Sequence, residues 1–259
     1  MSSPISLHAP ATAAKRLTIV GAALLGTISL AARPAVVAVA AGGSRATDGS
    51  TSVKGSGPPA RADWRDSIRL LNEQHFKHTA WGTAHSVRDY DVSKWIAATD
   101  HLTYDDDVLF AASYLHDIAG FPPWEKQGVD HQDRGAELMD SVLTGFGFPA
   151  EKIEKVKAAI RTHMPERAPG AAVESQLLHD ADGLDWLGAI GIARDMSIVD
   201  ANGGKPDFAW ALHRLRDDAA KVPGALVTKA AKREAERRLA VTRAFLKDLE
   251  SETKEPGEI

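Results

Sequence analysis

Apolar residues recur at helical spacing along most of the chain, from Arg61 to about residue 250. Residues three and four apart share one face of a helix, so this period is typical of amphipathic helices. We find no stretch that alternates strictly between apolar and polar residues for the length of a strand. The pattern therefore predicts an all-α domain, with helices over about 63–74, 83–99, 108–118, 130–146, 150–163, 174–198, 207–218 and 227–250.

The helix over 108–118 carries clear start and stop signals. Asp105-Asp106-Asp107 supplies a cap and favourable charge at its N-terminal end, where backbone N–H groups are unpaired. Gly120 and Pro122-Pro123 then stop the helix. Nearly every residue between these signals is apolar, which indicates a buried helix.

The first 40 residues do not read like the rest of the chain. Lys15-Arg16 precedes an uncharged apolar run from Leu17 to Ala32, and the segment ends in Ala38-Val39-Ala40. A basic start, an apolar middle and small residues at the end are the order of a secretory signal peptide. We therefore expect a signal peptide over 1–40 and an exported, periplasmic or secreted protein. An uncleaved N-terminal membrane anchor and a start codon placed too early are the alternatives.

Two further segments flank the helical domain, which spans 61–250. Residues 41–60 are rich in Gly, Ser, Thr and Pro and lack an apolar period, so we interpret them as a flexible linker. Residues 251–259 are interpreted as a disordered tail.

Composition excludes several kinds of chemistry. The chain has no Cys, which rules out disulfides, thiolate zinc sites and Cys nucleophiles, so any metal ion must be held by His, Asp or Glu. The 31 Lys and Arg against 35 Asp and Glu give a net charge of -4, which argues against a broad nucleic-acid-binding surface. The sequence also has no glycine-rich phosphate loop and no Gly-x-Ser-x-Gly nucleophile turn.

A polar pair, His116-Asp117, closes the apolar helix 108–118. Such a pair is costly to bury unless it is coordinated or hydrogen-bonded. An imidazole nitrogen and a carboxylate oxygen are good ligands for Mn, Fe, Co, Ni or Zn, and the carboxylate can bridge to a second ion. Taken alone, the pair is equally a His capped by a neighbouring carbonyl.

The pair is not isolated, because His85 stands 31 residues before His116 and Asp180 lies 63 residues after Asp117. The order His, His-Asp and a distant Asp, all on predicted helices, resembles the HD-domain metal-dependent phosphohydrolase superfamily over residues 64–250. Further matches to its small stand-alone members are Leu115-His-Asp-Ile118, Asp130-His-Gln-Asp-Arg-Gly-Ala136, Ala159-Ile-Arg-Thr-His163, Asp180-Ala-Asp-Gly-Leu-Asp185 and Ala189-Ile-Gly-Ile-Ala-Arg194. Ala119 departs from the commoner His-Asp-Ile-Gly, but it leaves the ligands intact.

The resemblance implies an HD-domain helical bundle with a metal site in its core. The resemblance assigns four ligands to one divalent ion (Mn, Fe, Co, Ni, Mg or Zn): His85, His116, Asp117 and Asp180. It also assigns His116 and Asp117 as the catalytic pair. In members with two ions, the places of His131 and His163 hold the second, and Asp117 would bridge the two. His163 ends the apolar stripe of the helix 150–163, so it should point into buried space. The alternative is that His131 and His163 line the pocket or bind substrate phosphate.

Several other polar residues are candidates for roles around such a site. Arg88, Lys126 and Arg134 are candidates for binding substrate phosphate, although each could instead be a surface or salt-bridge residue. Asp182 and Asp185 could orient the metal ligands, as carboxylates hydrogen-bonded to ligating residues do, or could serve in capping and charge pairing.

The resemblance implies hydrolysis of a small phosphorylated substrate, a phosphomonoester or phosphodiester with nucleotides among the candidates, by a metal-activated water. We expect no nucleic-acid polymer as partner and no membrane span once the leader is removed. Two alternatives use the same fold: a di-iron oxygenase that cleaves a C–P or C–C bond, and a non-catalytic ligand-binding module. Export sets the chain apart from relatives that are cytoplasmic nucleotide or signalling enzymes, and puts intracellular substrates in doubt.

Overall fold

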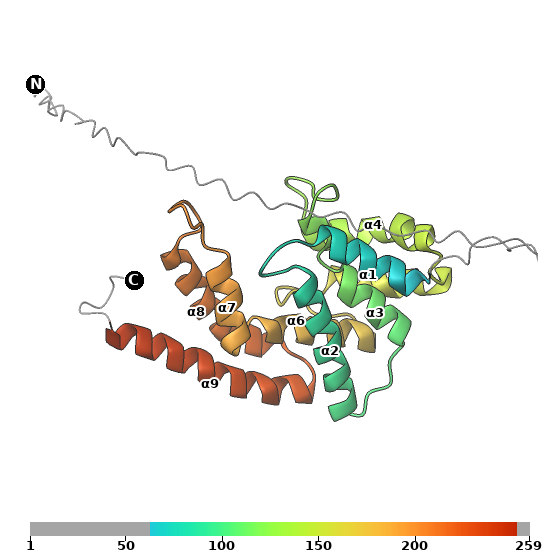
Figure 1. The fold of residues 1–259 in the computed structure, drawn as a ribbon. Coiled ribbons are helices and arrows are strands. Elements are labelled where there is room, and N and C mark those ends of the chain that lie inside the picture. The colour runs from blue at the N-terminus through green and yellow to red at the C-terminus, as the bar shows by residue number, and fades with distance from the viewer. Residues whose placement is uncertain (1–62, 253–259) are drawn as a thin grey trace, which may run out of the picture. The chain divides into compact units, whose positions relative to one another are not determined.

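In the computed structural model, which describes residues 63–252, this part of the chain folds entirely into helices and contains no strand. The predicted leader and linker and residues 253–259 lie outside the described residues. Within 63–252 there are nine α-helices and two short 3-10 helices. Their order is α1 (Trp64–His75), α2 (Thr83–Thr99), α3 (Asp106–Leu115), η1 (Ile118–Gly120), α4 (His131–Phe146), η2 (Ala150–Lys152), α5 (Ile153–Arg161), α6 (Val173–Asp185), α7 (Gly188–Ser197), α8 (Phe208–Ala225) and α9 (Lys229–Glu252), and Figure 1 shows how they are arranged. The all-α prediction is confirmed for this region.

Two hydrophobic clusters hold the helices together. One is built mainly from α1, α3, α4 and α5 around Phe110, and the other mainly from α2, α6 and α9 with the end of α8. Helices α3 and α6 contribute to both clusters and are buried on every side over most of their length. A helix that packs on every side is an interior element. The polar residues at the end of α3 and along α6 therefore lie inside the protein.

Helix starts follow the sequence signals closely. The side chain of Asp105 accepts hydrogen bonds from the backbone N–H groups of Asp107 and Val108, as expected for the residue that caps α3. Asp130 caps α4 in the same way, through Gln132 and Asp133. These two caps fix where α3, which leads to His116, and α4, which starts at His131, begin.

The stretch 174–198, predicted as one helix, is two helices separated by Trp186 and Leu187. Gly188 adopts a left-handed backbone conformation, with φ of +72°, which favours glycine and interrupts the helix. Helix α9 stabilises the break, because Arg238 donates to the carbonyl of Leu184 and Thr242 accepts from the N–H of Gly188. The break depends on residues about 50 positions away in the chain, so local sequence alone does not reveal it.

The contact between α4 and the end of α3 is unusually close. A Cβ atom at Gly135 would lie 3.1 Å from Ile160 Cγ2 and 3.3 Å from the carbonyl oxygen of His116. Few side chains fit at that distance. Gly135 thus lets α4, and with it His131, approach the His116-Asp117 pair.

The C-terminal helix α9 is the longest described helix, with 24 residues. Its buried residues all lie in the first 14 positions and are Ala230, Ala231, Ala235, Leu239 and Thr242, whereas Val241 is 39% exposed. The helix continues to Glu252, two residues into the predicted tail. Within 63–252 no helix combines the length and the apolar character that crossing a membrane requires.

Candidate metal centre

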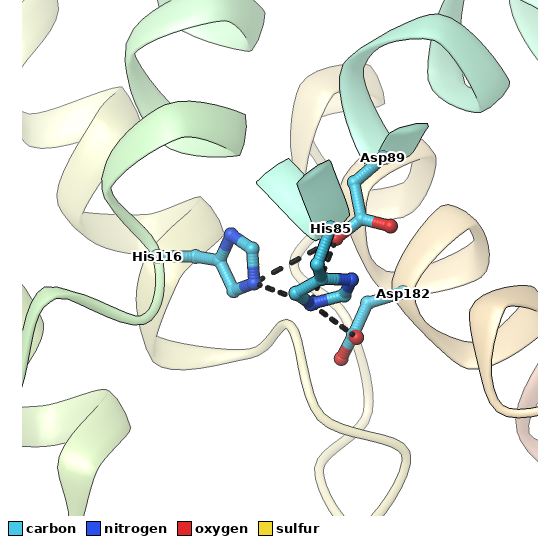
Figure 2. Close-up of side chains that lie close together, drawn as sticks. All are labelled: His85, Asp89, His116 and Asp182. Atoms are coloured by element: carbon cyan, nitrogen blue, oxygen red, sulfur yellow. Dashed lines mark hydrogen bonds and ion pairs between the residues drawn. The ribbon is translucent and has the colours of Figure 1, made fainter. Parts of the chain in front are cut away.

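Five polar side chains from α2, the end of α3 and α6 meet in the interior of the protein. They form what we call the first cluster, which consists of His85, Asp89, His116, Asp117 and Asp182. Figure 2 shows four of them directed toward one another, with both imidazole rings and both carboxylates around one point. Four of the five are almost completely buried, and Asp117 retains 13% exposure of its side chain.

The donor atoms of the first cluster are spaced as ligands of one ion would be. The Nε2 atom of His85 lies 3.1 Å from His116 Nε2, 3.2 Å from Asp89 Oδ2 and 3.3 Å from Asp182 Oδ1. Asp117 Oδ2 lies 3.2 Å from His116 Nε2. Donors that bind one ion at about 2.1 Å are separated from their neighbours by roughly 3.0–3.5 Å. These residues therefore fit a divalent metal ion.

Hydrogen bonds fix which ring nitrogen of His116 and His163 faces inward. His116 donates its Nδ1–H to the carbonyl of Ser113 at 2.9 Å, and His163 donates its Nδ1–H to the carbonyl of Ile160 at 2.7 Å. A carbonyl oxygen only accepts, so the proton must be on Nδ1. The Nε2 lone pair of each neutral ring is thereby free to bind a cation.

His85 is oriented in the same way by a carboxylate. Its Nδ1–H donates to Asp185 Oδ2 at 2.8 Å, and Arg88 binds the same carboxylate through Nε at 2.9 Å and Nη2 at 2.7 Å. Burial acts to raise the pKa of Asp185, but the hydrogen bonds from His85 and Arg88 hold that pKa below its ordinary value. Asp185 is thus confirmed as a residue that orients a candidate ligand.

A second cluster lies on the other side of Asp117 and consists of Asp117, His131 and His163. The Nε2 atoms of the two histidines are 3.4 Å apart, and they lie 3.8 Å (His131) and 3.7 Å (His163) from Asp117 Oδ1. Asp117 therefore presents Oδ2 to the first cluster and Oδ1 to the second. Burial acts to raise its pKa, but the neighbouring charges and hydrogen bonds, first those of His116, hold the pKa well below the ordinary range.

Asp180, predicted as a metal ligand, does not join either cluster. Its carboxylate accepts hydrogen bonds from the Thr228 N–H at 2.7 Å, the Thr228 hydroxyl at 2.6 Å and the Val227 N–H at 2.9 Å, just before α9. Two residues along a helix are about 200° apart around its axis, so Asp180 and Asp182 face nearly opposite directions. The structure corrects the prediction, because Asp182 occupies the place expected for Asp180.

Asp89 was not among the residues singled out from the sequence. It lies one turn after His85 on α2, so both side chains project toward the same side. It is fully buried, and neither of its carboxylate oxygens has a hydrogen-bond partner among the described residues. Burial, reinforced by repulsion from Asp185 and Asp182, raises its pKa well above the ordinary value. The only feature of the sequence that could have indicated Asp89 as a candidate ligand is its position four residues after His85, which places both on one face of the helix.

A cavity of about 350 Å³ opens over Asp117, His131 and Asp182. Trp186 forms part of its wall, with the guanidinium groups of Arg194 and Arg214 stacked on the indole at 3.6 Å and 4.1 Å from the ring centroid. Within the described region, these two arginines are the basic residues of the wall besides His131.

The three residues predicted to bind substrate phosphate lie elsewhere. Arg88 is paired with Asp185 behind His85. Arg134 contacts Glu137 and the carbonyl of Trp124, and Lys126 is exposed in the loop before α4. None of the three lines the cavity, whose arginines, Arg194 and Arg214, come from α7 and α8.

Known proteins resemble this chain in their three-dimensional structures. No family model matches the chain, and no curated protein matches it in sequence. A predicted HD superfamily hydrolase from an uncultured Thermotogales bacterium is 26% identical, with a TM-score of 0.51 over 73% of this chain and 90% of that one.

Two Bacillus structures give similar results. Bacillus subtilis YpgQ in complex with ADP is 21% identical, with a TM-score of 0.55 over 73% of this chain and 98% of that one. An HD-superfamily hydrolase from Bacillus thuringiensis is 22% identical, with a TM-score of 0.51 over 73% of this chain and 94% of that one. The fold is therefore similar to that of solved small HD superfamily proteins, as the sequence resemblance predicts.

Proposed function

We propose that this protein is a metal-dependent phosphohydrolase that cleaves a phosphomonoester or phosphodiester by attack of water on phosphorus. The observation that carries the proposal is the first cluster, in which buried imidazole lone pairs and carboxylate oxygens face one point beside a cavity. The likeness to solved HD superfamily hydrolases supports it. A divalent ion bound there would lower the pKa of a coordinated water and polarise a phosphoryl oxygen.

The residues of the chain have distinct parts in this proposal. His85, His116 and Asp182 hold the ion at the first cluster, and Asp185 fixes the ring of His85. Asp117 is shared, because its second oxygen faces the second cluster. We propose that His131 and His163 hold a second ion there, which makes Asp117 the bridging ligand.

The cavity supplies the substrate side of the site. Its volume of about 350 Å³ falls within the range of small-molecule pockets, roughly 300–1,000 Å³. Arg194 and Arg214 place positive charge in the wall, which suits a phosphorylated substrate. YpgQ is described in complex with ADP, which supports testing nucleotides first among phosphate esters.

The test is a reconstitution assay on chelator-treated protein. Each of Mn, Fe, Co, Ni, Mg and Zn is added in turn, and release of inorganic phosphate or p-nitrophenol is followed with nucleotides, p-nitrophenyl phosphate and bis-p-nitrophenyl phosphate. Oxygen consumption is recorded in parallel, with Asp117→Ala protein as the blank.

Metal-dependent hydrolysis that is the same with and without oxygen supports the proposal. Oxygen-dependent turnover by the iron form would replace it with the di-iron oxygenase. Metal binding without any turnover would favour a ligand-binding module.

We also propose that the protein is exported by the leader over residues 1–40. The order of a basic start, an apolar run and Ala38-Val39-Ala40 supports this. N-terminal sequencing of the mature protein from a cell fraction tests the proposal, and a soluble cytosolic form that retains Met1 contradicts it.

A further inference from the structure

Asp89 is the residue of the first cluster that neither the sequence motif nor any comparison assigns. Figure 2 shows its carboxylate directed from α2 toward the rings of His85 and His116. Its Oδ2 atom lies 3.2 Å from His85 Nε2 and 3.6 Å from His116 Nε2. It is also fully buried, so water cannot solvate its charge.

In their neutral form, the two imidazole rings offer this carboxylate no proton. His85 and His116 already donate from Nδ1, to Asp185 and to the carbonyl of Ser113, so in the neutral rings both Nε2 atoms carry lone pairs. These Nε2 atoms are 3.1 Å apart, and both lie near Asp89 Oδ2. In the neutral rings the two lone pairs and the carboxylate oxygen therefore surround one point, as the ligands of a cation do.

Other neighbours do not supply a donor either. The guanidinium of Arg194 donates to the carbonyl of Ala80 at 2.6 Å and contacts Asp185 and His85, but no ion pair or hydrogen bond joins it to Asp89 in the described region. Both oxygens of Asp89 remain without a hydrogen-bond partner in the described region. A buried carboxylate in this state is strongly unfavourable unless it takes up a proton or a cation lies close to it.

We propose that Asp89 is itself a ligand of the ion at the first cluster, in addition to His85, His116, Asp117 and Asp182. The inference rests on the metal site of the proposed function and adds a fifth protein donor to it. With Asp89, three carboxylates and two imidazoles surround the ion. Tetrahedral zinc takes four ligands, whereas ions with higher coordination numbers and a preference for oxygen suit five donors. The ion at this site is therefore Mn²⁺ or Fe²⁺ in preference to Zn²⁺.

The test compares Asp89→Asn with wild type, using full-length chelator-treated protein titrated with Mn²⁺ and with Zn²⁺. The amide keeps the size of the side chain but removes the negative charge. We expect the variant to bind Mn²⁺ at least tenfold more weakly, with a smaller loss for Zn²⁺. Asp91→Asn is the matched control, because Asp91 is on the same helix and has an exposed side chain.

Thermal unfolding separates a metal ligand from a residue with only a structural role. Without metal, Asp89→Asn should melt at a higher temperature than wild type, because the buried charge is gone. Its melting temperature should rise less than that of wild type when Mn²⁺ is added. A structural role predicts lower stability with and without metal.

A measurement on the wild-type protein covers the case in which the variant does not fold. Co²⁺ bound by five or six donors absorbs weakly in the visible range, whereas tetrahedral Co²⁺ absorbs strongly. Weak absorption at one equivalent of Co²⁺ is expected, and strong tetrahedral absorption would overturn the inference.

The outcomes for Asp89 and for the proposed function are distinguishable. If Asp89→Asn binds Mn²⁺ with wild-type affinity, the inference about Asp89 is wrong, but the hydrolase proposal stays intact. Wild-type protein that binds no metal would refute the proposed function itself.

Discussion

His85 donates its Nδ1–H to the carboxylate of Asp185, 2.8 Å away and 100 residues further along the chain. This bond decides which nitrogen of the ring faces the first cluster, and the negative charge increases the basicity of that nitrogen. Asp185→Asn should therefore weaken Mn²⁺ binding by about 10–100-fold while the fold is retained. Metal titration followed by circular dichroism of the same samples checks this. Unchanged affinity would show that His85 is oriented without Asp185.

Asp117 is the residue whose loss should affect both clusters. Asp117→Ala removes Oδ2 from beside His116 and Oδ1 from beside His163, so metal content and phosphate release should both fall to background. Metal analysis of the purified variant and the phosphate assay are the measurements. A variant that keeps its metal and its turnover would contradict the assignment of this residue.

The second cluster makes a separate prediction about the number of ions. His131→Ala and His163→Ala should each reduce the metal content of saturated protein from about two ions per chain toward one. His101→Ala, a change at an exposed His outside both clusters, is the control.

If His131 and His163 bind substrate phosphate instead, the wild type should hold one ion, and the variants should show a raised KM with unchanged metal content. Saturated wild-type protein with a single ion per chain would remove the second site from the proposal.

Asp180 and Asp182 should respond in opposite ways to mutation. Asp180→Ala leaves the buried N–H and hydroxyl groups of Thr228 without their acceptor and should lower the free energy of unfolding by about 3 kcal/mol. Metal affinity of the folded variant should stay within a fewfold of wild type. Asp182→Asn should show the reverse, with little loss of stability but much weaker metal binding. Denaturant unfolding and metal titration of the two variants decide between them.

Asp195 and Asp218 provide a pH-dependent contribution to stability away from the metal centre. Both approach the Nε of Arg214, at 3.1 Å and 3.4 Å, and Asp195 also follows Arg194 in the chain. Burial first, and then the charge of Asp218, raise the pKa of Asp195 to about 7. The pKa of Asp218 is raised to about 6, again chiefly by burial.

A raised carboxyl pKa means that the folded protein keeps a proton that the unfolded chain releases near pH 4. The stability from this proton is fully present below pH 4 and is lost as pH rises to about 7. Asp195→Asn should reduce this slope, leaving the part due to Asp218, and should be more stable than wild type at pH 8, on the order of 2 kcal/mol. Melting curves from pH 4 to 8 test this, with the exposed Asp248→Asn as control. Parallel curves for wild type and Asp195→Asn would refute the shift.

The parts of the fold that depend on local pattern were predictable. The helix predicted over 83–99 is present with these bounds, and His85, His116 and Asp117 lie together, as the resemblance implied. His163 is fully buried, as its place at the end of an apolar stripe indicated.

Features that depend on distant contacts were not predictable. Asp180 and Asp182 are indistinguishable in the sequence until the position of α9 shows which one Thr228 contacts. The basic residues of the cavity, Arg194 and Arg214, come from two helices whose relative placement no local pattern encodes. Asp89 carries no mark in the sequence except its spacing from His85, because its burial is a property of the packed helices.

The hydrogen bonds of Asp180 connect the C-terminal part of the described chain to the helix that carries the candidate ligand Asp182. The same helix, α6, carries Asp180 on the side tied to Thr228 and Asp182 on the side that faces His85. A proteolytic cut before Thr228 would expose a bare carboxylate two residues from a proposed ligand and would remove the support that Arg238 gives to the end of α6. Digestion that trims α9 should therefore release bound metal, although α9 contributes no residue to either cluster.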